Sequence, residues 1–256
     1  MKNVKLNNGV EMPILGFGVY LIPDYDECKR AVLDALETGY RLIDTASAYF
    51  NEKAVGDAIK ESGINRKELF ITTKLWHTDS GYEKTKKGFE NSMEKLQLDY
   101  LDLYLIHQPF GDYYGSWRAM EELYENKKIR AIGVCNFYPD RFLDLVEHNK
   151  IVPAVNQIEI HPLFQREYEE SIMKPYGTQM EAWSPLVRGE KILDNETLKN
   201  IGAKYGKTPA QVILRWLIQR NIIVIPKSVH KERIIENFNI FDFELSSDDM
   251  DKVKSM

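Results

Sequence analysis

The fold is decided by three adjacent segments: Leu69-Phe-Ile-Thr-Thr-Lys74, a helical pattern over residues 82–96, and Tyr100-Leu-Asp-Leu-Tyr-Leu-Ile-His107. The first and third segments are short and apolar almost throughout, which is typical of strands buried on both faces. The middle segment is long enough for four turns of helix. A strand, a helix and a second strand in this order predict a parallel sheet.

The same alternation extends in both directions along the chain. Further strands are expected at residues 14–18, 41–46, 129–136, 154–160, 179–183 and 222–227. Further helices are expected at residues 25–36, 52–61, 116–125, 141–148, 168–174, 196–204, 208–218 and 231–238. Asp24 and Gly39 bound the first of these helices, and Thr208-Pro209 begins another with an N-cap and a first-turn proline. Eight such units in about 250 residues predict an α/β fold, the closed (β/α)8 or TIM barrel.

Residues outside the eight units predict how the barrel begins and ends. Val4-Lys-Leu6, the Asn8-Gly9 turn and Val10-Glu-Met12 match a tight β-hairpin, which we expect to lie across the bottom of the barrel. No linker or charge block interrupts the pattern, so residues 1–256 are expected to form a single domain. The chain stops at Met256, which predicts a short C-terminal tail and a wide, shallow pocket with loose specificity.

Composition argues against several classes of function. Lysine and arginine total 34 against 39 acidic residues, a net charge of −5, which disfavours general nucleic-acid binding. The chain lacks an apolar run of membrane-spanning length, and its first ten residues lack the apolar region of a signal peptide. We therefore expect a cytoplasmic protein without membrane partners, acting as a monomer. Two cysteines and five dispersed histidines predict neither a disulfide framework nor a metal site.

Unusual polar residues stand at or just beyond the C-terminal ends of the predicted strands, where barrels of this kind carry their chemistry. They include Asp44, Tyr49, Lys74 and His107. An adjacent ammonium group stabilises a tyrosinate, so Lys74 is expected to lower the pKa of Tyr49 and make it a proton donor. Asp44 would keep Lys74 charged, and His107 would hydrogen-bond the substrate oxygen. This set suits carbonyl reduction, with the hydride supplied by a nicotinamide cofactor because no side chain can supply one.

The segments that carry these four residues resemble the aldo-keto reductase superfamily. They are Gly39-Tyr-Arg-Leu-Ile-Asp-Thr-Ala-Ser-Ala-Tyr-Phe-Asn-Glu52, Thr73-Lys-Leu-Trp76 and Leu105-Ile-His107. The resemblance runs from Asn8 to about Leu245 and is strongest to bacterial and lower-eukaryote members such as diketogluconate and glyoxal reductases. It implies an enzyme that reduces aldehydes and ketones to alcohols, with Tyr49 as the general acid and the other three residues in support.

A cofactor site is also expected at the barrel mouth. Gly16-Phe-Gly-Val-Tyr-Leu21 lacks the third glycine of a Rossmann fingerprint, whereas the loops after the last two strands of such barrels commonly form an anion site. The resemblance implies NADPH/NADP+ as cofactor, with Lys227, Ser228 and Arg233 around the 2′-phosphate, and two cations there favour NADPH over NADH. The other implied contacts are Gly18, Val19, Asp44, Asn136, Gln157, Trp183, Ser184, Leu186, Val229, Glu236 and Asn237.

The resemblance also assigns parts to some of these residues. Asn136 and Gln157 are implied to bind the nicotinamide carboxamide, and Trp183 to stack on the ring, while residues 236 and 237 lie near the adenine. Cys135 stands where family members usually have serine, which weakens or removes one hydrogen bond to the carboxamide. His230 stands where relatives often have arginine, threonine or asparagine, which bears on the strength of NADP selectivity.

The substrate pocket is expected to be lined by Tyr20, Trp76, His107 and Gln108. Gln108 stands where many relatives have tryptophan, so this wall of the pocket is expected to be more polar. Small polar carbonyl compounds such as glyoxals, hydroxyketones or sugar-derived ketones are therefore favoured over steroids.

Other interpretations stay open from the residues alone. Asp44 and Lys74 could be a structural buried ion pair, His107 a core histidine and Tyr49 a packing aromatic. Lys74 could instead be the Schiff-base nucleophile of an aldolase, with a sugar phosphate bound near Lys227. A third possibility is a module that binds NADPH as a sensor and turns over little substrate.

Overall fold

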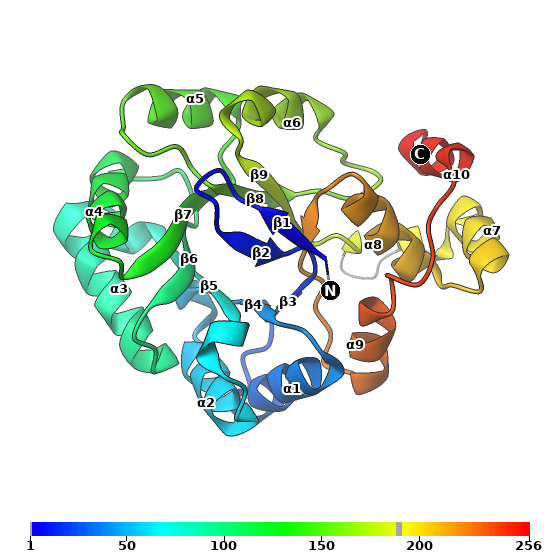
Figure 1. Ribbon diagram of the computed structural model, residues 1–256, viewed down its shortest axis with the longest axis horizontal. Helices are drawn as coiled ribbons and strands as arrows, with labels where there is room; N and C mark the ends of the chain where they lie inside the picture. The colour runs from blue at the N-terminus through cyan, green and yellow to red at the C-terminus, as the bar shows by residue number, and fades with distance from the viewer. Residues whose placement is uncertain (1, 188–190) are drawn as a thin grey trace.

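Eight parallel strands form a nearly closed barrel surrounded by helices (Figure 1). The computed structural model describes residues 2–187 and 191–256. Neighbouring strands follow the order of the chain: β3 (Gly16–Gly18), β4 (Leu42–Asp44), β5 (Phe70–Leu75), β6 (Leu101–Ile106), β7 (Ile129–Cys135), β8 (Val155–Glu159), β9 (Gln179–Trp183) and β10 (Ile223–Val224). The predicted (β/α)8 barrel is confirmed.

The ring is closed between its first and last strands. The Val224 N–H donates to the Ile14 carbonyl over 3.0 Å, and the Gly18 N–H donates to the Pro226 carbonyl over 3.1 Å. A Cβ at Gly18 would lie 3.0 Å from the Ile225 carbonyl oxygen, so a glycine allows this close approach. β10 is shorter than the predicted strand at residues 222–227, although backbone hydrogen bonds to the neighbouring strands continue at Ile225 and Pro226.

Helices cover the outside of the barrel. They are α1 (Tyr25–Thr38), α2 (Glu52–Ser62), α3 (Tyr82–Leu96), α4 (Tyr113–Glu125), α5 (Pro139–Glu147), α6 (Glu167–Met173), α7 (Glu196–Tyr205), α8 (Pro209–Gln219), α9 (Lys231–Phe238) and α10 (Ser247–Lys254). The Asp24 side chain caps α1 by accepting from the Glu27 N–H, and Thr208 forms a capping box with Gln211 on α8. α4 begins earlier than predicted because Asp112 accepts the Gly115 N–H.

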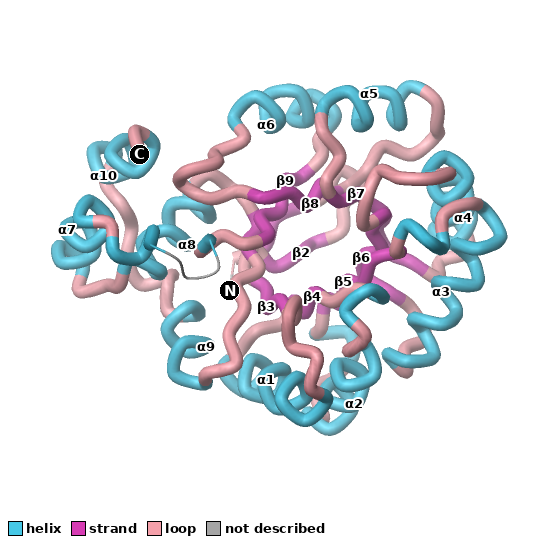
Figure 2. The backbone as a smooth tube through the Cα atoms, turned by 180° about the vertical axis from the view of Figure 1, so that it is seen from behind, coloured by secondary structure: helices cyan, strands magenta, loops and turns pink. Residues whose placement is uncertain are grey.

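The N-terminal hairpin lies where the sequence predicts it. Strands β1 (Asn3–Lys5) and β2 (Glu11–Pro13) pair antiparallel. Side-chain amides in the turn reach the N-terminal ends of two barrel strands, since Asn7 donates to the Pro153 carbonyl and Asn8 to the Arg130 carbonyl. The hairpin crosses one end of the ring in Figure 1, and in Figure 2 the opposite end faces the viewer with the hairpin behind it. The hairpin therefore covers the bottom of the barrel.

The C-terminal segment forms helix α10, which the sequence did not predict. Ser246 caps it by accepting the Asp249 N–H, and Asp249 pairs with Lys204 and accepts from the Tyr205 hydroxyl over 2.8 Å. These contacts attach α10 to α7. Among the described residues, no helix has both the length and the apolar character needed to cross a membrane.

Candidate active site

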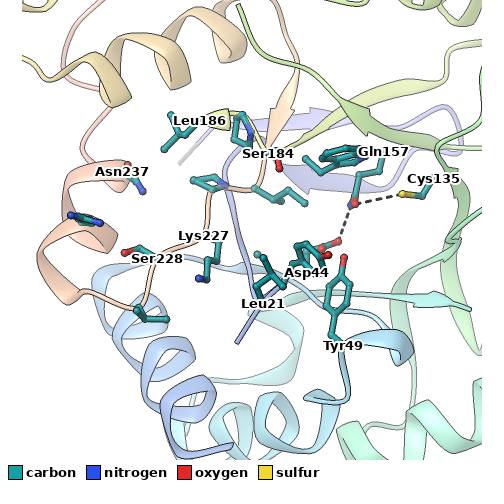
Figure 3. Close-up of a pocket in the computed structure, with 18 of the residues that line it drawn as sticks. Leu21, Asp44, Tyr49, Cys135, Gln157, Ser184, Leu186, Lys227, Ser228 and Asn237 are labelled. Atoms are coloured by element: carbon teal, nitrogen blue, oxygen red, sulfur yellow. Dashed lines mark hydrogen bonds between the residues drawn. The ribbon is translucent and has the colours of Figure 1, made fainter. Parts of the chain in front are cut away.

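A cavity of about 970 Å³ opens at the mouth of the barrel, lined by residues from the strand ends and the loops beyond them. Every predicted cofactor and substrate residue except Val19 lines it. Figure 3 shows its two ends: Tyr49, Asp44, Gln157 and Cys135 lie at one, and Lys227, Ser228, Leu186 and Asn237 at the other. The tertiary structure thus brings together two groups of residues that lie far apart in the sequence.

Tyr49 is held against the barrel by its own loop. It ends a short 3₁₀ turn, Ser47–Tyr49, and the Ser47 hydroxyl donates to the Lys74 carbonyl over 2.9 Å. The next loop residue of note is the buried Asn51, whose amide donates to the Val19 and Ile22 carbonyls. These bonds tie the loop after β4 to β5 and to the loop after β3, so the Tyr49 ring has a defined position.

Lys74 is fully buried behind Tyr49 and has three hydrogen-bond acceptors. Its Nζ donates to Asp44 Oδ1 over 2.5 Å, to the Thr45 carbonyl over 2.9 Å and to the Tyr49 hydroxyl over 3.5 Å. An ammonium group has three N–H bonds, so all of its donors are used. Because the Tyr49 oxygen accepts from Lys74, its own O–H is free to donate into the cavity.

The charges of this cluster follow from burial and from the short ion pair. Burial is the largest single influence and favours a neutral amine, but the charge and hydrogen bond of Asp44, with smaller contributions from Tyr49 and Cys135, together outweigh it. The pKa of Lys74 is therefore raised, which keeps the ammonium group charged. Burial raises the pKa of Tyr49 above its usual range, and Lys74 offsets only part of that rise. The predicted lowering of the Tyr49 pKa is therefore wrong in direction for the free protein, since desolvation outweighs the attraction of one ammonium group. Tyr49 is a protonated phenol at neutral pH.

His107 faces Tyr49 from the end of β6. The two ring centroids lie 5.6 Å apart, and Trp76 packs edge-on against His107 at 5.0 Å. Burial, with Lys74 as a second cause, lowers the pKa of His107 to about 3. The imidazole is therefore neutral at neutral pH and can donate one hydrogen bond to a substrate oxygen.

Two side-chain amides form the wall beside this cluster. The Asn136 amide donates to the His107 carbonyl over 3.1 Å, and its oxygen accepts from the Trp183 indole N–H over 2.9 Å. Asn136 has a left-handed backbone with φ of 62°, a conformation that asparagine tolerates better than most residues. The Gln157 amide donates to Asp44 Oδ2 over 2.8 Å. Amides beside a half-buried indole suit a flat ring that bears a carboxamide.

The other end of the cavity is cationic. Lys227 and Arg233 line it with exposed side chains, and neither forms a salt bridge with another residue of the described ranges. The Ser228 hydroxyl accepts the His230 N–H over 3.1 Å, just before α9 begins. Two cations beside a helix N-terminus suit a phosphate group. The residues of both ends therefore fit the phosphate and nicotinamide parts of NADPH.

Val19 differs from the other predicted contacts. It is fully buried, its N–H donates to the Asp44 carbonyl, and its carbonyl accepts from Asn51. The structure therefore gives no support for a Val19 contact with the cofactor. Sequence reasoning also missed several residues that line the cavity: Leu21, Ala48, Phe50, Pro185, Leu193, Ala210, Ile225 and Pro226. Most of them lie in loops or short turns after the strands, and no periodic signal marks such a side chain that turns into a cavity.

A buried glutamate beside Gln157 was missed as well. Glu181 lies in the middle of β9, opposite Gln157 in the parallel ladder, and its Oε2 accepts from the Gln157 amide over 3.0 Å. One signal in the sequence could have identified Glu181, since it is a carboxyl group in the centre of a strand predicted to be buried. Burial, with Asp44 as a second cause, raises the pKa of Glu181 to about 8.

A (β/α)8 barrel with a buried Asp–Lys–Tyr line, a neutral histidine and a cavity suited to a dinucleotide defines an oxidoreductase of the nicotinamide-dependent class. The chain belongs to the aldo/keto reductase family, whose model matches residues 15–256.

Comparison with known proteins agrees with this assignment. The chain is 53% identical to a glyoxal reductase of Bacillus subtilis over 254 residues, which cover 99% of this chain and 92% of that one. It is 43% identical to a methylglyoxal reductase of Escherichia coli over 257 residues, with coverage of 99% and 92%. Among solved structures, the aldo-keto reductase of Bombyx mori in complex with NADP matches with a TM-score of 0.94 and 35% identity, covering 99% of this chain and 92% of that one.

Proposed function

We propose that this protein reduces small polar aldehydes and ketones, glyoxals among them, to alcohols with NADPH. The observation that carries the proposal is the hydroxyl of Tyr49, which accepts from a buried, charged Lys74 at the closed end of a dinucleotide-sized cavity. Relatives named as glyoxal and methylglyoxal reductases support the substrate class. The polar side chain of Gln108 in the cavity wall supports it too.

In the proposed reaction, a carbonyl compound lies between Tyr49, His107 and Trp76. NADPH, when bound, supplies the hydride that forms the new C–H bond. The neutral His107 donates a hydrogen bond to the carbonyl oxygen and sets its direction. As negative charge develops on that oxygen, the Tyr49 O–H transfers its proton to it, which completes the alcohol. Lys74 stabilises the tyrosinate that remains until it regains a proton from solvent.

The cofactor is proposed to lie along the cavity, with its nicotinamide at the Tyr49 end. Gln157 and Asn136 would hold the carboxamide and Trp183 would cover the ring. Lys227, Ser228 and Arg233 would hold the 2′-phosphate. The remaining proposed contacts line the cavity between these ends: Gly18, Asp44, Ser184, Leu186, Val229, Glu236 and Asn237.

Replacement of Tyr49 by phenylalanine tests this proposal. The variant loses its general acid, so kcat with methylglyoxal should fall by about 10²- to 10⁴-fold, measured as oxidation of NADPH by absorbance. NADPH affinity, measured by quenching of tryptophan fluorescence, should change less than about twofold, because Tyr49 is proposed to contact the substrate oxygen. Tyr25→Phe is the matched control, since Tyr25 donates to Asp57 on the outer helices. Full activity in Tyr49→Phe would contradict the proposal, and a wild-type protein that binds NADPH without turnover would favour the sensor alternative.

The aldolase alternative conflicts with the position of Lys74. A Schiff-base lysine must reach its substrate as a free amine. Lys74 is fully buried, its three donors are engaged, and Asp44 keeps it charged.

We further propose that the chain acts as a single-domain monomer in the cytoplasm, without nucleic-acid or membrane partners. The net charge of −5 supports solubility and disfavours a phosphate backbone as partner. Light scattering after size-exclusion chromatography tests the monomer directly, because a dimer would have twice the mass of 29.8 kDa.

A further inference from the structure

Glu181 is a buried carboxyl group that has no role in the proposed reaction. It stands on β9 inside the barrel, with no exposed surface. The Gln157 amide nitrogen donates to two carboxyl groups, to Glu181 over 3.0 Å and to Asp44 over 2.8 Å. A primary amide has two N–H bonds, so both of its donors are used inside the barrel.

Because both N–H bonds point toward the carboxyl groups, the Gln157 side-chain carbonyl points away from them. Its Oε1 lies 3.8 Å from Cys135 Sγ, on the side that lines the cavity. Figure 3 shows Gln157 between Asp44 and Cys135, with a dashed line to each. A flipped amide would place its oxygen against the Asp44 carboxylate and would give up the N–H bond to Glu181 Oε2, so the two contacts together favour the observed orientation.

We propose that Glu181 is a positioning residue, which together with Asp44 holds the Gln157 amide so that its carbonyl accepts from the carboxamide N–H₂ of the nicotinamide. This inference rests on the proposed NADPH-dependent function. Glu181 itself touches neither cofactor nor substrate in this arrangement; its effect passes through Gln157.

The charges around Glu181 are consistent with this positioning role. The titratable groups that act on it are Asp44 from β4 and Lys74 from β5, and Cys135 on β7 lies across Gln157. Because the Glu181 pKa is raised to about 8, the group is a neutral acid at neutral pH and adds no second negative charge beside Asp44. A neutral carboxyl group keeps a carbonyl oxygen that can accept the Gln157 N–H. Its Oε1 is buried and has no hydrogen-bond partner among the described residues, so it has no donor that would stabilise a carboxylate there.

Equilibrium binding of NADPH, followed by quenching of tryptophan fluorescence, tests this inference without turnover. Glu181→Leu removes the acceptor and should weaken NADPH binding about tenfold, the effect of one lost hydrogen bond in a buried site. Glu181→Gln keeps an acceptor oxygen at the same position and should bind within about threefold of the wild type. Glu121→Gln is the matched control, because Glu121 is a buried glutamate on α4 that accepts backbone N–H groups far from the cavity. Circular dichroism establishes that each variant is folded, and Glu181→Ala replaces the leucine variant if that one does not fold.

A double-mutant cycle with Gln157→Ala separates positioning from a merely structural effect. If Glu181 acts through Gln157, removing Glu181 should cost no further affinity once Gln157 is alanine. At saturating NADPH, kcat of Glu181→Leu should stay within about threefold of the wild type, because the Lys74–Tyr49 contact is retained. Wild-type NADPH affinity in the leucine or alanine variant, or additive losses in the cycle, would overturn the inference. Failure of the wild type itself to bind NADPH would instead overturn the proposed function.

Discussion

The raised pKa of Glu181 predicts how the stability of the protein changes with pH. The ordinary glutamate value is 4.5 and the folded value is about 8. Between these values the unfolded chain releases a proton that the folded protein keeps, so stability is fully present below pH 4.5 and is lost as pH rises toward 8. Each unit corresponds to about 1.4 kcal/mol, so the full loss approaches about 5 kcal/mol and the part between pH 6 and pH 8 is about 2 kcal/mol.

Urea denaturation of the wild type and Glu181→Gln between pH 6 and pH 9 measures this effect. The glutamine variant cannot ionise at this position, so the wild type should lose about 2 kcal/mol relative to it from pH 6 to pH 8 and little more above that value. Asp57→Asn is a control at a carboxyl group whose pKa is lowered rather than raised. Its three hydrogen-bonding partners, with Lys53 the strongest, hold the pKa of Asp57 below its usual range, so its difference from the wild type should stay constant over the same pH interval. A constant difference for Glu181→Gln as well would refute the reasoning.

Three other predictions concern the remaining site residues. Lys74→Met leaves Asp44 as an unpaired buried charge, so it should lower the free energy of unfolding by about 3–5 kcal/mol in urea titrations, and unchanged stability would count against the ion pair. Arg233→Ala should raise the KM for NADPH about tenfold and leave that for NADH nearly unchanged, because only NADPH carries the 2′-phosphate; equal changes would argue against that contact. His107 has a pKa of about 3, so a pH profile of kcat from 5 to 8 should lack a step due to imidazole, and a step that disappears in His107→Gln would be inconsistent with a neutral histidine.

Local patterns in the sequence predicted most of the barrel correctly. Helices α3 and α9 and strand β9 have the predicted bounds, because the spacing of their apolar residues matches the side that is buried. Helix α10 was missed because its sequence, SDDMDKVK, is mostly polar. It is held by contacts between Asp249 and residues of α7, and no local pattern reveals a contact across 45 positions of the chain.

For the catalytic cluster too, the sequence predicted some features and missed others. Residue type and position at a strand end were enough to single out Asp44, Tyr49, Lys74 and His107, and the structure places all four together at the mouth. The direction of the Tyr49 pKa could not be obtained in this way. It depends on how deeply the phenol is buried, and the depth is set by Tyr20, His107 and the other segments that pack around it.

The sequence by itself determined the number of strand–helix units and which residue types stand at the strand ends, because hydrophobic periodicity and capping act over a few neighbouring residues. Only the tertiary structure decided that Gln157 meets both Asp44 and Glu181, and that Lys74 is enclosed while Tyr49 opens into the cavity. These contacts join residues of different strands, which come close together only when the strands form the barrel. Burial and charge pairing, which control the pKa values of the site, depend on those distances.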